Sequence, residues 1–210
     1  MVGGMRLTSP NLEHGEPFPA TNAFAVPDPD EHIRYAANRN PALRWDEVPD
    51  GTRSFVLVLV DEDVPSVGDD VNQEDRTVPG DLPRVDFVHW VLVDIPGDVR
   101  SLEEGAYSEG VTSGGKPGLD ATMREGINDY TGWFEGDPEM GGTYKGYDGP
   151  CPPWNDSIIH HYVFTLYALD LERTRVEGDF TADDVRRAID GHVLADASLM
   201  GTYTLNPDLI

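Results

Sequence analysis

Three short runs of strand-forming residues constrain the fold of this chain more than any other feature. They read SFVLVLV (54–60), FVHWVLVDI (87–95) and HHYVFTLYALD (160–170). Runs of this length, rich in Val, Leu and aromatic residues, are typical of strands buried on both faces of a sheet. LMGTYTL (199–205) predicts a last strand. The sequence therefore predicts a mainly β fold of antiparallel sheets.

Helices are expected only near the C-terminus. Thr181 is a good N-cap for ADDVRRAID, with Asp184 three residues later as in a capping box. The segment HVLADA (192–197) predicts a second short helix. We find no internal repeat and no linker, so we expect a single domain over residues 1–210.

The charge excludes one class of partner. The net charge is −24, and only two of the fifteen basic residues are lysines. A chain this acidic does not bind nucleic acid or anionic membranes nonspecifically. An acid-rich, lysine-poor surface suits molar salt, where self-repulsion is screened. We interpret the chain as a halophilic protein.

Cysteine usage and hydropathy indicate the compartment. The single cysteine, Cys151, excludes an internal disulfide and fits a reducing environment. The N-terminus MVGGMRLTSP lacks the apolar core of a signal peptide, and no run of 18 apolar residues could span a membrane. We therefore expect a cytoplasmic protein.

Cys151, His89, His160 and His161 raise the question of a metal site or a nucleophile. Adjacent histidines in a strand point to opposite faces, and no CxxC or HxxxH pair is present. We therefore expect no metal and no cofactor. Cys151 lies between prolines, where packing in a tight turn explains it better than nucleophilic catalysis does.

A pocket for an anion is the third interpretation. Alternation places His160 and Tyr162 on one face of their strand, and Asp61 and Asp63 on one face of another, while His89 lies within a third. Buried strands rarely carry such residues without partners. Spacing alone leaves open whether they share one cavity or are satisfied separately.

Four segments together resemble the phosphatidylethanolamine-binding protein family, in its bacterial and archaeal Raf-kinase-inhibitor-like branch. They are NRNPALRWDEVPDGTRSFVLVLVDEDVPS (38–66), DFVHWVLVDIP (86–96), YKGYDGPCPPWNDSIIHHYVFTLYALDL (144–171) and GHVLADASLMGTY (191–203). The resemblance implies an antiparallel β-sandwich with short helices near the C-terminus. It also implies a small pocket for phosphate and similar anions.

The resemblance assigns the ligand-binding residues one by one. They are Asp61, Asp63, His89, Gly149, Cys151, Pro153, His160 and Tyr162. The backbone N–H groups of Gly149 and Cys151 are expected to be donors, and His161, where the family usually has arginine, is expected to face away. The insert 66–86 is expected to roof the cavity or to contact a second copy.

The function implied is that of a soluble, non-catalytic binder of phosphorylated or other small anionic ligands. Regulation of a protein partner, as in kinase or protease inhibitors, and a homodimer are compatible with the resemblance. The alternative is an enzyme that uses Asp61, His89 and His160 for acid–base chemistry on a small phosphorylated or carbonyl substrate. A ligand screen and a search for turnover separate the two.

Overall fold

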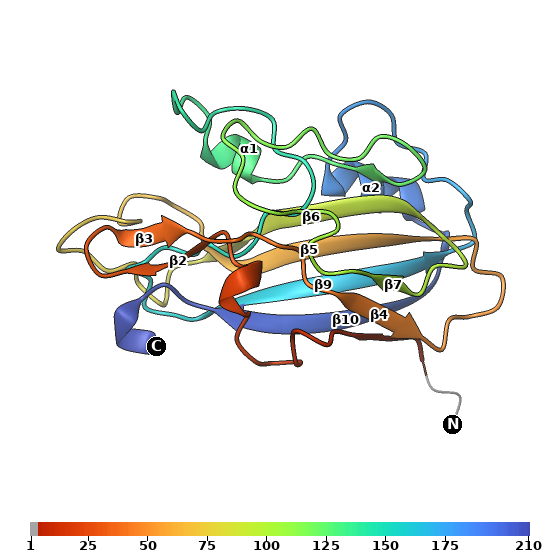
Figure 1. Ribbon diagram of the computed structural model, residues 1–210, viewed down its shortest axis with the longest axis horizontal. Helices are drawn as coiled ribbons and strands as arrows, with labels where there is room; N and C mark the ends of the chain where they lie inside the picture. The colour runs from red at the N-terminus through yellow and green to blue at the C-terminus, as the bar shows by residue number, and fades with distance from the viewer. Residues whose placement is uncertain (1–3) are drawn as a thin grey trace.

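The computed structural model describes residues 4–210 and is built on a five-stranded antiparallel sheet with the strand order β10-β9-β5-β6-β8. Its long strands contain the apolar runs (Figure 1). The bounds are Ser54–Pro65 for β5, Arg84–Pro96 for β6, Arg124–Glu125 for β8, His160–Leu169 for β9 and Val193–Tyr203 for β10. The mainly β fold class is confirmed.

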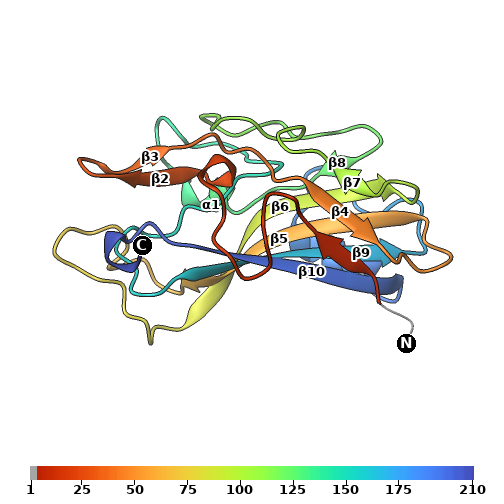
Figure 2. The ribbon, with the colours of Figure 1, turned by 60° about the horizontal axis from the view of Figure 1, so that its bottom comes forward.

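Alternation along the strands divides the core between the two faces of this sheet. Phe55, Leu57 and Leu59 pack toward a smaller sheet with the order β1-β4-β7. Its strands are β1 (Arg6–Thr8), β4 (Leu43–Asp46) and β7 (Ser101–Leu102). Figure 2 shows this sheet lying over the long strands. The intervening valines of β5 pack on the opposite face, which helix α2 (Ala182–Ile189) covers.

One end of the molecule carries the elements that surround the candidate site. The hairpin of β2 (Ala25–Asp28) and β3 (His32–Tyr35) projects there, and the segment between β5 and β6 lies at the same end (Figures 1 and 2). Helix α1 (Tyr130–Trp133) packs beside the hairpin through Phe24 and Tyr130. The remaining elements are two short 3₁₀ helices, η1 (Ala20–Asn22) and η2 (Pro207–Leu209).

The two predicted C-terminal helices have different outcomes. α2 begins as expected: Thr181 N–H donates to Asp184 Oδ2 at 2.9 Å, and the Asp184 N–H donates to Thr181 Oγ1 at 3.3 Å. The second helix, over 192–197, is wrong, because these residues fall almost entirely within β10. Pairing of Val193 and Ala195 with β9 overrides the helix preference of Leu and Ala.

Of the helices within residues 4–210, none combines the length and the apolar character that a bilayer crossing needs.

Candidate functional site

A cavity of about 290 Å³ opens at the end of the molecule that carries the hairpin. Its walls are mostly apolar and aromatic. They come from β3, the segment after β5, α1 and the proline turn, with Phe24, Ile33, Tyr35, Val64, Pro65, Val67, Val71, Phe87, Tyr130, Trp133, Phe134, Pro152 and Pro153. The polar part of the wall includes Asp61, His89, Cys151 and His160.

The insert 66–86 contributes directly to this cavity. Ser66, Val67, Gly68, Val71 and Asn72 lie along one wall. The segment is fixed by the buried side chain of Asn155, whose amide donates to the carbonyl oxygens of residues 70, 73 and 76 at 2.9, 3.2 and 3.0 Å. The insert is therefore an ordered wall of the site.

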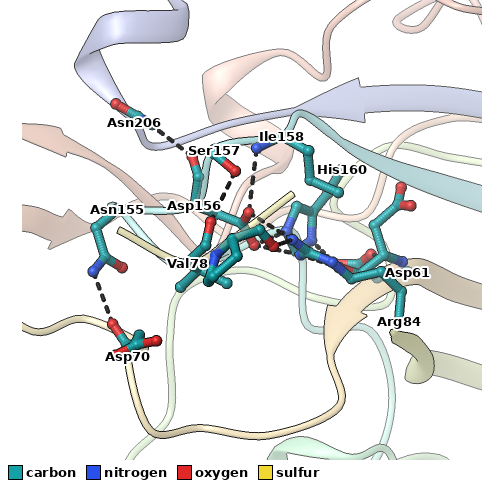
Figure 3. A network of polar contacts seen from close by, with 12 residues as sticks. Asp61, Asp70, Val78, Arg84, Asn155, Asp156, Ser157, Ile158, His160 and Asn206 are labelled. Atoms are coloured by element: carbon teal, nitrogen blue, oxygen red, sulfur yellow. Dashed lines mark hydrogen bonds and ion pairs between the residues drawn. The ribbon is translucent and has the colours of Figure 1, made fainter. Parts of the chain in front are cut away.

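His160 is held between two carboxylates at the base of the cavity. Its Nδ1 donates to Asp61 Oδ2 at 2.7 Å, and its Nε2 donates to Asp156 Oδ2 at 3.0 Å. Arg84 extends this series of hydrogen bonds by donating to both oxygens of Asp156, at 2.6 and 3.0 Å. Figure 3 shows the imidazole between Asp156 and Asp61, with Arg84 alongside. The ring therefore has no N–H left for a ligand.

The charges of Asp61, His160, Asp156 and Arg84 balance one another. Burial acts to lower the pKa of His160, but the hydrogen bonds and charges of Asp156 and Asp61 outweigh it and raise the pKa to about 9. The bonds from His160 and Arg84 likewise outweigh burial at Asp156 and lower its pKa. Two cations thus compensate two carboxylates, and these four side chains together carry no net charge at neutral pH.

A β-bulge directs His89 into the cavity. Leu59 pairs with Trp90 and Val60 with Val88, so His89 is the additional residue on β6. Bulges re-aim side chains in this way beside functional sites. Val88 consequently packs on the α2 side, while Trp90 packs between the sheets.

His89 differs from His160 in its charge. Its Nδ1 lies 2.7 Å from the carbonyl oxygen of Asp148 and donates to it. Burial lowers the pKa of His89, against the opposing charges of Asp61 and Asp148. The imidazole is therefore neutral at neutral pH, and Nε2, which has no hydrogen-bond partner within residues 4–210, carries a lone pair.

Cys151 and Tyr162 are protonated neighbours of the site. Burial raises the pKa of the Cys151 thiol to about 12. The backbone N–H of Cys151 has no partner within the described residues and can serve as a donor. Tyr162 lies behind the cavity wall, with its ring centroid 5.2 Å from that of His89, and its buried hydroxyl lies beside Asp61 without a well-formed hydrogen bond in the described part of the chain.

The structure brings only some of the eight predicted residues to the cavity. Asp61, His89, Cys151, Pro153 and His160 line it. The N–H of Gly149 donates to Asn38 Oδ1 at 2.8 Å, which corrects the expectation that it is a free donor.

Asp63 does not line the cavity either. It accepts from the backbone and the imidazole of His161 at 2.7 Å each. His161 itself is exposed, which confirms that it faces away.

Sequence reasoning missed three parts of the site. Asp156 holds His160, Arg84 holds Asp156, and α1 supplies an aromatic wall. Asp156 lies four residues before His160, and this spacing was the one available signal. Within residues 4–210, no group of three His, Cys, Asp or Glu side chains is placed to hold a metal ion.

Two curated proteins of other organisms are similar in sequence to most of this chain. The chain is 30% identical over 200 residues to the UPF0098 protein YbhB of Escherichia coli, covering 95% of this chain and all of that protein. It is 35% identical to a UPF0098 protein of Methanothermobacter thermautotrophicus over 166 residues, which are 79% of this chain and 83% of that protein.

Solved structures give the same result. A phosphatidylethanolamine-binding protein homologue from Chlamydia trachomatis superposes with a TM-score of 0.63 at 28% identity, covering 95% of this chain and 97% of the other. The family profile described as phosphatidylethanolamine-binding protein matches residues 8–204. The resemblance noted in the sequence is confirmed, and the chain belongs to the phosphatidylethanolamine-binding protein family.

Proposed function

We propose that this protein is a non-catalytic binder of a small ligand whose acidic head, such as a phosphate monoester, enters the cavity carrying one proton. The observation that carries the proposal is a pair of acceptors on the cavity wall. Each oxygen of Asp61 already accepts one hydrogen bond, Oδ1 from the Asp63 N–H at 2.9 Å and Oδ2 from His160 at 2.7 Å, and keeps a lone pair for a further donor. Nε2 of neutral His89 has no donor within residues 4–210, so both groups can accept a hydrogen bond from the ligand.

The charges of the site favour the singly ionised head over the doubly ionised one. No Lys or Arg lines the cavity in the part of the chain that the structure describes, and His160 is compensated by its two carboxylates. A dianion would meet the charge of Asp61 without a free cation. A monoanion keeps an O–H that can donate to Asp61 or to His89, and its other oxygens can accept from the N–H of Cys151.

The walls indicate the body of the ligand. The ring centroids of Phe24 and Tyr130 lie 4.4 Å apart with an angle of 14° between their planes, and Phe134 stacks on Tyr130 at 5.8 Å. These rings cover one another's faces, so the more exposed cavity rings of Tyr35 and Trp133 remain to accept an aromatic or flat apolar group. Phenyl phosphate combines both features and is a suitable probe.

A second candidate, acid–base catalysis, is favoured by one observation. The unprotonated Nε2 of His89 has the form that a general base needs. Incubation of the protein with phenyl phosphate, followed by a search for released phenol, separates this enzyme from the binder.

Calorimetric titration in molar KCl tests the binding proposal. The second ionisation of a phosphate monoester lies near pH 6. We expect phenyl phosphate to bind at least about tenfold more tightly at pH 5.5 than at pH 8, because the monoanion becomes scarce. Phenyl sulfate, which has no acidic proton in this range, is the matched control and should bind weakly at both values.

Asp61→Asn supplies a second control. An amide in place of the carboxylate can donate to a dianion, so this variant should lose most of the preference for low pH. Equal affinity of the native protein for phenyl phosphate at both pH values, or tighter binding at pH 8, would overturn the proposal.

A further inference from the structure

The main chain of Asp148 makes two hydrogen bonds with His89. The imidazole donates from Nδ1 to the Asp148 carbonyl at 2.7 Å, and the Asp148 N–H donates to the His89 carbonyl at 3.1 Å. These two bonds fix the ring at the bulge. The charge of the Asp148 side chain acts on His89 as well and favours a higher pKa of the imidazole.

The side chain of Asp148 is a buried carboxylate that accepts three hydrogen bonds from three residues. Asn38 Nδ2 and Lys116 Nζ donate to Oδ1 at 2.8 and 2.7 Å, and Asn128 Nδ2 donates to Oδ2 at 2.9 Å. The same Asn128 amide donates to the carbonyl of Gly146 at 3.1 Å. Lys116 is the only charged donor in this set within the described residues.

We propose that Lys116 is a positioning residue for His89, acting through Asp148: its ammonium compensates the buried carboxylate and so keeps the imidazole neutral, with Nδ1–H on the Asp148 carbonyl and Nε2 free for a ligand. Which ligand group Nε2 contacts in the cavity rests on the proposed function, whereas the protonation state of His89 in the free protein does not.

The surroundings of His89 explain why a compensating cation matters. The titratable groups that face it or share its cavity are Asp61 from β5, Asp129 and Tyr130 from the start of α1, Asp148 and Cys151 from the turn, and His160 and Tyr162 from β9. The charges of Asp61, Asp148 and Asp129 each act to raise the pKa of His89, and burial acts against them. Neutralising Asp148 by an ion pair tips this balance toward the neutral ring.

The two lysines of the chain provide a matched pair for the test. Lys116 is largely buried on a buried carboxylate, whereas Lys145 pairs with the exposed Asp179. Long-range ¹H–¹⁵N spectra of the imidazoles, recorded from pH 5 to pH 9 without ligand, report the tautomer and the pKa of each histidine. His89→Gln assigns the resonance.

Two single variants should shift the titration of His89 in opposite directions. Lys116→Met leaves a carboxylate uncompensated and should raise the pKa of His89 by roughly half a unit or more. Asp148→Asn leaves the ammonium and should lower it. The double variant removes both charges and should return near the native value, and Lys145→Met should change nothing.

The signs of these shifts decide the proposal. If folded Lys116→Met and Asp148→Asn both leave the titration and tautomer of His89 unchanged, Lys116 only stabilises the fold and the proposal is overturned. Should Lys116→Met fail to fold, Asp148→Asn against the double variant decides in its place, since identical titrations of those two would also overturn it.

Ligand binding distinguishes a failure here from a failure of the proposed function. Lys116→Met should move the pH profile of phenyl phosphate binding in step with His89. A shifted His89 without any phenyl phosphate binding in native protein would leave the role of Lys116 supported and the proposed function contradicted.

Discussion

Asp61 and His160, 99 residues apart in the chain, share a 2.7 Å hydrogen bond at the base of the cavity. The bond joins the neighbouring strands β5 and β9. It makes His160 a buried cation that organises the site, while Asp61 keeps a face on the cavity. The cavity wall consequently presents a carboxylate beside a neutral imidazole.

The first prediction concerns stability and pH. The pKa of His160 is raised from 6.5 to about 9 in the folded protein. Its contribution is therefore fully present below pH 6.5 and is lost as the pH rises through about 9. The loss in free energy of unfolding is on the order of 3 kcal/mol. Urea denaturation in molar KCl at pH 6 and pH 9.5 measures it.

The adjacent histidine provides the control. His161→Gln should keep the same pH dependence, because the His161 side chain is 48% exposed. His160→Gln should lose most of it and unfold at lower urea, since two buried carboxylates lose their shared cation. A steeper effect in His161→Gln would contradict the assignment.

Tyr162→Phe should not destabilise the protein. The buried hydroxyl lies beside Asp61 without a well-formed hydrogen bond in residues 4–210, so its removal should change the free energy of unfolding by less than about 1 kcal/mol in either direction. Urea denaturation checks this. A larger loss would show that the hydroxyl is hydrogen-bonded in solution.

Cys151→Ser should keep the fold and bind phenyl phosphate within about twofold of native affinity. Burial raises the pKa of the thiol to about 12, so almost no thiolate exists at neutral pH, and the backbone N–H that we propose as a donor to the ligand is retained. Calorimetry measures the affinity. Loss of a measurable turnover in a folded Cys151→Ser protein would favour the enzyme.

We expect folding to depend on salt. The net charge of −24 opposes the compact state until counterions screen it, and the Debye length falls to about 3 Å at 1 M salt. The melting temperature, followed by circular dichroism, should rise from about 0.1 M to about 3 M KCl. A melting temperature that stays constant would remove the halophilic interpretation.

The regular parts of the fold could be predicted because each rests on local pattern. The buried runs became β5, β6 and β9, the capping box at Thr181 formed, and alternation placed His161 outward. These features depend on neighbouring residues alone.

The site depended on long-range pairing, which local pattern does not encode. The bulge at His89 exists because β5 and β6 change register there, with no Gly or Pro in the run to mark it. Arg84 reaches Asp156 across 72 residues. The first part of β10 is likewise a strand because it pairs with β9, although its own sequence, 192–197, predicted a helix, whereas the strand expected over 199–205 forms as far as Tyr203.

The protonation state of a bound phosphate tests the central claim most directly. The ³¹P chemical shift of phenyl phosphate distinguishes its monoanion from its dianion, so a titration with excess protein from pH 5 to pH 9 reports the ionisation of the bound ligand. We predict that the bound ligand stays monoanionic beyond pH 7, with its second pKa raised above the value near 6 in water, because Asp61 and His89 retain its proton. A bound phosphate that ionises at a lower pH than the free ligand would contradict the account.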